Sequence, residues 1–155
     1  ESKEDIRSGE DLLESKRYSR VVFFGQQAAE KSIKALFEME HIFIAEHDLS
    51  NFFVKFIYNN KNYFSFKKEI DEILELLHYF EGEVGKSRYP REKNGKIITP
   101  MEIYKSEEAT SSLDKANEIY NLVKAILVKK FKFKEGEFVQ EIRTDGNEKL
   151  GEDDE

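Results

Sequence analysis

The stretch from residue 86 to residue 96 concentrates side chains that bind anions. It reads KSRYPREKNGK and holds five bases against one acid. Arg88 and Arg91 carry planar guanidinium groups, whose paired N–H donors match phosphate and carboxylate oxygens. Tyr89 offers a ring for stacking, and Pro90 biases it toward an extended backbone. The stretch predicts an anion or nucleotide clamp. The alternative is a structural plug, with Tyr89 packed on the protein body and Arg88 paired with a carboxylate such as Glu30.

A second group of candidates lies in residues 25–36, GQQAAEKSIKAL. Lys31 and Lys34 are three residues apart, so on a helix they share a face and could hold a phosphate together. Gln27 and Glu30 flank them and can form hydrogen bonds or ion pairs. The alternative is that Glu30 and Lys34 form an ordinary i,i+4 pair, contributing only a few tenths of a kcal/mol.

The sequence His47-Asp48-Leu49 places an imidazole next to a carboxylate. A histidine can act as a general base near neutral pH, so His47 is a candidate for proton transfer. Alternatively, Asp48 caps the following helix and the ring of His47 packs over the turn.

Several site classes have no residues to support them. The chain has no cysteine and only three histidines, and no two histidines are spaced three or four apart as in a helical metal site. It contains no GxxxxGK[ST], no GxGxxG and no serine nucleophile elbow. We therefore expect no metal ion and no cofactor.

The charge is unevenly distributed. The net charge is −7, and residues 135–155 alone hold nine acids and two bases, so the rest of the chain is neutral. A general electrostatic case for nucleic acid binding therefore fails. No stretch is apolar enough to span a bilayer or serve as a signal peptide, and we expect a cytoplasmic protein.

The elements that must position these residues are mainly helical. Apolar residues recur at helical spacing in several stretches, and prolines occur only at positions 90 and 100. The pattern predicts helices over residues 4–17, 19–40 (capped by Ser19), about 49–58 (capped by Asp48 or Ser50), 66–81 and 106–130, with a single turn at 99–102. Residues 82–98 are predicted to form a long polar loop. The fold predicted is an all-α, up-and-down antiparallel bundle of four or five helices.

Small residues mark one helix for close packing. Gly25, Ala28, Ala29 and Ser32 allow another helix to approach, either within the fold or across a two-fold axis. The predicted domain is a bundle over residues 1–130, followed by an extension over 131–155. That extension has a possible β-hairpin from Phe131 onward and ends in an acidic tail.

Together these pieces resemble the HEPN domain family, of the prokaryotic type associated with nucleotidyltransferases. The residues that carry the resemblance are, in order, Tyr18, FFGQQAAEKSIKAL at 23–36, His47-Asp48-Leu49, Ser87-Arg88-Tyr89-Pro90, and Ala109, Leu113 and Ala116. The resemblance covers about residues 5–128. It makes Gln27, Glu30, His47, Asp48 and Pro90 family-motif residues.

Membership implies a helical bundle that is commonly a homodimer, and a role linked to nucleotides or RNA. Many relatives are partners of a minimal nucleotidyltransferase in toxin–antitoxin pairs, and others are metal-independent ribonucleases with an arginine followed after four to six residues by histidine. That motif is absent here, because no arginine is followed by histidine at that spacing. The usual acid–base group for the 2′-hydroxyl proton is then missing.

The sequence thus predicts a non-catalytic HEPN protein that binds a nucleotide or a nucleotidyltransferase partner through Lys31, Lys34, Arg88, Tyr89 and Arg91. One alternative is a ribonuclease toxin with a divergent site, in which His47 acts as the general base. The other is a purely structural, homo-oligomeric assembly protein.

Overall fold

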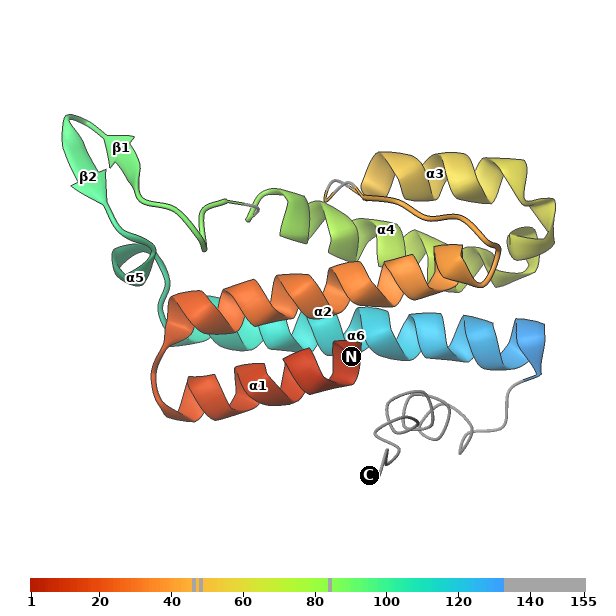
Figure 1. The fold of residues 1–155 in the computed structure, drawn as a ribbon, viewed down its shortest axis with the longest axis horizontal. Coiled ribbons are helices and arrows are strands. Elements are labelled where there is room, and N and C mark those ends of the chain that lie inside the picture. Colours follow the sequence, from red (N-terminus) through yellow and green to blue (C-terminus); the bar gives the residue numbers. More distant parts are fainter. Residues whose placement is uncertain (46, 48, 84, 133–155) are drawn as a thin grey trace, which may run out of the picture.

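The computed structural model describes residues 1–45, 47, 49–83 and 85–132. It confirms an all-α fold in which long helices lie roughly alongside one another (Figure 1). The helices are α1 (Ser2–Glu14), α2 (Tyr18–Glu38), α3 (Ser50–Asn59), the 3-10 helix η1 (Lys61–Phe66), α4 (Lys67–Glu81), α5 (Pro100–Ile103) and α6 (Ser106–Phe131). Two short strands, β1 (Arg91–Lys93) and β2 (Lys96–Ile98), form an antiparallel hairpin.

The small residues of α2 serve packing inside this chain. A Cβ on Gly25 would lie 2.5 Å from the Oγ of Ser112 and 3.1 Å from its carbonyl oxygen, so α2 and α6 approach closely there. On another face of α2, the hydroxyl of Ser2 in α1 donates to the Ala28 carbonyl (2.8 Å) and contacts the Ser32 hydroxyl (2.7 Å). Of the two packing alternatives, contact within the fold is the one found.

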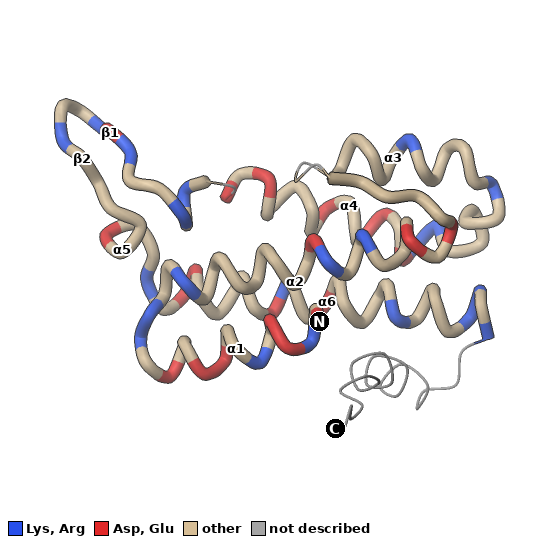
Figure 2. Tube along the Cα trace, viewed as in Figure 1, with Lys and Arg blue, Asp and Glu red and all other residues tan. Residues whose placement is uncertain are grey.

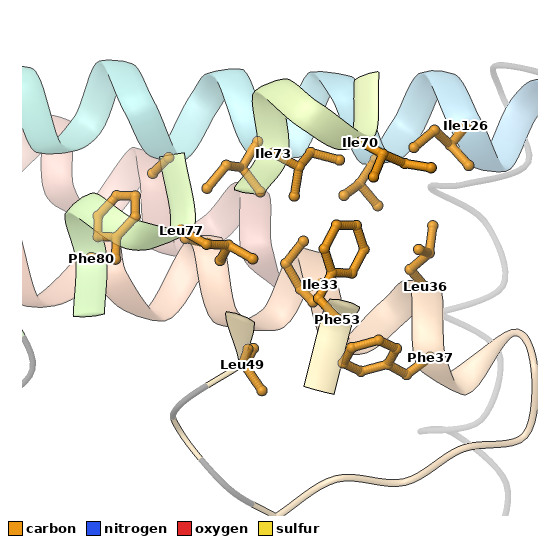
Figure 3. Packing of buried hydrophobic residues seen from close by; sticks show 14 of the residues in the cluster. Ile33, Leu36, Phe37, Leu49, Phe53, Ile70, Ile73, Leu77, Phe80 and Ile126 are labelled. Atoms are coloured by element: carbon orange, nitrogen blue, oxygen red, sulfur yellow. The ribbon is translucent and has the colours of Figure 1, made fainter. Parts of the chain in front are cut away.

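The main core lies between α2, α4 and α6, and α3 closes it from one side (Figure 3). Ile33 and Phe37 of α2 are fully buried, as are Ile73 of α4 and Ile126 of α6. Phe53 of α3 points into the same cluster, with its ring 6.3 Å from that of Phe37. This burial of large apolar side chains holds α3 and α4 against α2, which is where the candidate residues lie.

Two predicted helix caps are wrong. The N-cap of α2 is Arg17, not Ser19, because Lys16 adopts a left-handed backbone (φ 56°) that turns the chain directly into the helix. The N-cap of α3 is Leu49, and Ser50 is already helical. The N–H of Ser50 donates instead to the Glu81 carboxylate at the end of α4, at 3.2 Å. The predicted cap Asp48 lies outside the described residues.

Residues 82–98 are not a loop throughout, because they include the β1–β2 hairpin. Its turn is Asn94-Gly95, both with positive φ (54° and 75°), as a two-residue hairpin turn requires. The predicted turn after it is confirmed: Thr99 donates its N–H to Glu102 at 2.8 Å, and α5 is one turn long. The dipeptide Asn-Gly is typical of such turns, so the sequence already contained evidence for this hairpin.

At the C-terminal end, α6 continues through Phe131. Residue 131 is therefore helical and does not begin a strand, and the rest of the predicted hairpin and the acidic tail lie outside the described residues. Within the described part of the chain, none of the helices combines the length and the apolarity that crossing a membrane requires.

A carboxylate network ties the end of α2 to η1 and α6. Glu40 accepts hydrogen bonds from Lys130 (2.9 Å) and from the Tyr63 hydroxyl (2.8 Å). The bond from Lys130 is the main cause that holds the pKa of Glu40 below its usual 4.5. Because folding lowers this pKa, the carboxylate stabilises the fold above its unfolded pKa, and the contribution is lost as pH falls through the folded pKa.

We therefore expect Glu40→Gln to lower the free energy of unfolding by about 1 kcal/mol at pH 7. The difference from the unmodified protein should shrink as the pH falls below 4.5. Urea unfolding at a series of pH values measures it. Glu75→Gln, at an exposed position of α4, is the control. A difference that stays constant with pH would contradict the assignment.

Candidate functional site

Glu30 is the centre of the first polar cluster. It lies on α2, and its side chain is only 10% exposed. Both carboxylate oxygens lie within hydrogen-bond distance of His47 Nδ1, at 2.9 and 3.0 Å, and Lys34 Nζ lies 2.9 Å from Oε1. The carboxylate therefore orients the imidazole, leaving Nε2 free of that contact, and the His47 side chain is 56% exposed.

Beside this pair lies a small pocket between α2, the start of α3 and the end of α4. Its polar lining comes from Gln26, Glu30, His47 and Glu81, and its apolar lining from Ala29, Leu49, Leu77 and Phe80. Its volume of about 20 Å³ suits roughly one water molecule. Gln26 is 3% exposed, and its Oε1 has no hydrogen-bond partner among the described residues. The pocket is lined by both polar and apolar residues and is too small for a nucleotide.

The two candidate lysines are each paired with a carboxylate. Lys31 Nζ lies 2.7 Å from Asp5 Oδ2 of α1, and Lys34 pairs with Glu30 as the i,i+4 alternative predicted. The Lys31 pair thus links α2 to α1, and the Lys34 pair lies within α2. Their predicted role in holding a phosphate stays a prediction.

Arg88 forms a second cluster, on the segment that follows α4. Its guanidinium carbon lies 4.9 Å from the centre of the Phe23 ring on α2. Arg88 Nε and Nη2 are buried and have no hydrogen-bond partner among the described residues, and the same holds for Ser87 Oγ and Gln27 Nε2. Gln27 follows Phe23 by one turn of α2, so it lies on the same face. Unpaired buried donors are costly, and two of these residues, Ser87 and Arg88, are neighbours in the segment after α4.

The base of this segment is fixed by Glu83. Its carboxylate accepts hydrogen bonds from the Tyr104 hydroxyl (2.5 Å) and from Lys86 (3.0 Å). Burial raises the pKa of Tyr104, and the bond to Glu83 raises it further, so the phenol stays a donor at neutral pH. The structural plug is not what forms: Tyr89 is 67% exposed, and Glu30 pairs with His47 and Lys34, not with Arg88.

Tyr89, Pro90 and Arg91 lead out of the bundle and into the hairpin. Pro90 and Arg91 are exposed as well, and basic positions mark the hairpin in Figure 2. The predicted binding residues therefore do not lie together in one site. Phe23, where Arg88 stacks, and Lys34 are eleven residues apart on α2, roughly 16 Å along the helix. The structure separates a Glu30–His47–Lys34 cluster from an Arg88 cluster, with Asp48 outside the described residues.

Three contributors were not predicted as site residues: Phe23, Ser87 and Glu81, although Phe23 and Ser87 lie in stretches that carry the family resemblance. Phe23 looked like one more apolar residue of an amphipathic helix, and Ser87 like part of a polar loop. Glu81 lies 31 residues after Ser50, whose backbone N–H donates to the Glu81 carboxylate. Only the packing of α4 on α2 brings such residues to the site.

Comparison with known proteins covers most of the chain. Residues 1–126 match the HEPN domain. The chain is also 28% identical over 134 residues to a Methanocaldococcus jannaschii protein named "Putative toxin MJ1304", an alignment that covers 86% of this chain and 88% of the relative. The search of solved structures found no match. With the family match extending from α1 into α6, the chain belongs to the HEPN domain family.

Proposed function

We propose that this chain is a toxin-type HEPN protein that binds a phosphate-bearing ligand, a nucleotide or a short RNA, at Arg88. The relative named as a toxin supports the first half of the proposal. The buried Nε and Nη2 of Arg88, which have no hydrogen-bond partner among the described residues, carry the second half. A guanidinium stacked on an aromatic ring is held flat and can present its donors side by side to phosphate oxygens.

The surroundings of Arg88 suit such a ligand. Ser87 Oγ and Gln27 Nε2 add two further donors without partners among the described residues. Tyr89 follows directly and is exposed, so its ring is free to stack on a base. A nucleotidyltransferase partner would bring a nucleotide to the same donors, which makes the partner expected from the family compatible with this site.

Titration calorimetry with ATP, GTP and a short single-stranded RNA tests the site. Removing a charged donor pair costs about 1.5–3 kcal/mol, so Arg88→Ala should weaken binding at least about tenfold. Arg88→Lys keeps the charge but loses the paired donors, so its affinity should lie between that of the unmodified protein and that of Arg88→Ala. Arg7→Ala, an exposed arginine of α1 paired with Glu4, is the matched control and should bind normally.

The proposal fails if the unmodified protein binds none of these ligands, alone or together with a nucleotidyltransferase partner. It also fails if Arg88→Ala, with an unchanged melting temperature, binds as tightly as the unmodified protein.

The Glu30–His47 geometry favours a second candidate function, cleavage of RNA at a site other than the absent arginine–histidine motif. With Nδ1 bonded to the Glu30 carboxylate, Nε2 of His47 is available to accept the 2′-hydroxyl proton. The freed 2′-oxygen would bond to the adjacent phosphorus as the bond from phosphorus to the 5′-oxygen breaks, and the leaving 5′-oxygen would take its proton from solvent water. Glu30 follows Phe23 by seven residues, roughly 10 Å along α2, so this candidate site is separate from the Arg88 cluster.

For this candidate we expect RNA to be cut to 2′,3′-cyclic phosphate ends in the presence of a metal chelator. His47→Ala should lower the rate about 100-fold or more. His78→Ala is the control, because His78 is an exposed residue of α4 bonded to the Leu74 carbonyl. Gel analysis of a labelled RNA gives the rates. RNA that stays intact after long incubation with the unmodified protein would exclude this candidate and leave the binding proposal standing.

A further inference from the structure

The β1–β2 hairpin projects beyond the end of the bundle (Figure 1). Among the described elements, its two strands make extensive contact only with each other. Each strand has three residues, and nearly every side chain is exposed. A two-stranded ribbon is marginally stable in water unless it packs on something, and its outer edges leave backbone groups unpaired. The hairpin is therefore an element that needs a partner surface.

Its exposed side chains define the chemistry of that surface. Ile97 is 76% exposed, and Met101, just beyond the hairpin in α5, is 82% exposed. Lys93 lies directly opposite Lys96 in the ladder. Like charges opposite one another destabilise a strand pair, so an anionic neighbour would relieve their repulsion. The partner surface should thus be acidic, with some room for apolar side chains.

A surface of this kind lies on α6 of the same chain. A shallow, open depression, called the α6 groove below, follows the first half of the helix and is lined by Ser106, Glu107, Thr110, Ser111, Asp114, Lys115 and Glu118. Glu107, Asp114 and Glu118 are exposed, and none forms an ion pair with a described residue. Lys115 is engaged elsewhere: its ammonium group donates to Ser111 Oγ (2.7 Å) and sits over the Tyr79 ring (4.7 Å).

We propose that the hairpin of one copy of this protein docks in the α6 groove of a second copy. The lysines of the hairpin then face Asp114 and Glu118, and Ile97 and Met101 become covered. Reciprocal docking uses the same two surfaces on each copy and closes a two-fold dimer without exposing further hairpins. We assign the hairpin to the α6 groove because their charges are complementary: the hairpin is basic and the groove is acidic.

Cross-linking tests the contact directly, because the chain has no cysteine. Copies carrying Lys96→Cys are mixed with differently tagged copies carrying Asp114→Cys, and a bismaleimide is added. We expect a strong cross-link between the two tags. Lys61→Cys, at the start of η1 and away from the hairpin, replaces Lys96→Cys in the control and should give little product. Equal yields from both mixtures would overturn the contact.

Charge-reversal variants test the pairing of the hairpin lysines with the α6 carboxylates, because loss of the dimer lowers the mass measured in solution. Sedimentation equilibrium should show that K93E/K96E and D114K/E118K each weaken the dimer at least tenfold, and that one chain carrying all four changes recovers most of the affinity. K61E/K68E, remote from both surfaces, should leave the dimer unchanged. A protein that is monomeric at every concentration overturns the proposal. So does K93E/K96E if it abolishes RNA binding without altering the mass, since the hairpin then contacts nucleic acid. Arg88→Ala should leave the mass unchanged, so this proposal and the ligand site fail separately.

Discussion

Gly25→Val should destabilise the protein by roughly 3 kcal/mol or more, the largest effect expected of any single change described here. A Cβ at this position would lie 2.5 Å from Ser112 Oγ and 3.1 Å from the Ser112 carbonyl, and valine adds two methyl groups beyond it. Because the closest backbone belongs to α6, the seam between α2 and α6 must open. Urea unfolding and the melting temperature measure the loss.

Two comparisons make the Gly25 prediction specific. Gly82→Ala is the matched control, because a Cβ there would meet only the Tyr79 carbonyl at 3.6 Å and Lys86 Nζ at 3.9 Å. It should be neutral or stabilise by up to about 1 kcal/mol. Adding Ser112→Ala to Gly25→Val should restore part of the lost stability, since Ser112 Oγ has no hydrogen-bond partner among the described residues. Full stability of Gly25→Val alone would show that the two helices do not meet at this glycine.

Glu30→Ala should have the second largest effect, a loss of about 2 kcal/mol. The change removes the acceptor of His47 and leaves Lys34, whose side chain is 22% exposed, beside an emptied carboxylate site. The segment before α3 should also loosen, because His47 is its polar link to α2. Chemical denaturation measures the stability, and amide hydrogen exchange at Ile44, His47 and Leu49 measures the loosening.

The control for Glu30→Ala is Glu38→Ala on the same helix. Glu38 is exposed, so its removal should change stability by less than about 0.5 kcal/mol and leave exchange near His47 unaltered. If Glu30→Ala matches this control, the Glu30–His47 contact contributes nothing to the fold, and any role of the pair is chemical alone.

The helices were largely predictable because their signal is local. Apolar spacing placed α4 at residues 66–81, and it forms over Lys67–Glu81. The Thr99–Glu102 box was also predicted correctly, since both partners lie within one turn. The cap of α3 was not, because its acceptor is Glu81, distant in sequence. The hairpin was not predicted, although Asn94-Gly95 is typical of a hairpin turn, because the strands on either side are short and charged.

For the candidate site, too, the sequence predicted the residue types but not their contacts. The sequence singled out Glu30, His47 and Arg88 as residue types able to bind or transfer protons. It did not indicate that Glu30 would face His47, or that Phe23 would lie under Arg88. Five residues were grouped as one binding site from residue type. The fold separates them: Lys31 pairs with Asp5, Lys34 with Glu30, Arg88 stacks on Phe23, and Tyr89 and Arg91 lead into the hairpin.

The sequence by itself determined the helical bundle, the close approach at Gly25, the family motifs and the lack of an arginine–histidine pair at ribonuclease spacing. These follow from periodicity, residue size and spacing along the chain. The tertiary structure alone decided that Lys31 pairs with Asp5 and that Glu30 contacts His47, and it left Arg88 Nε and Nη2 without a hydrogen-bond partner among the described residues. Ion pairs and stacking act over a few ångströms between residues that the chain separates widely, so only the packing of α1, α4 and α6 around α2 selects among them.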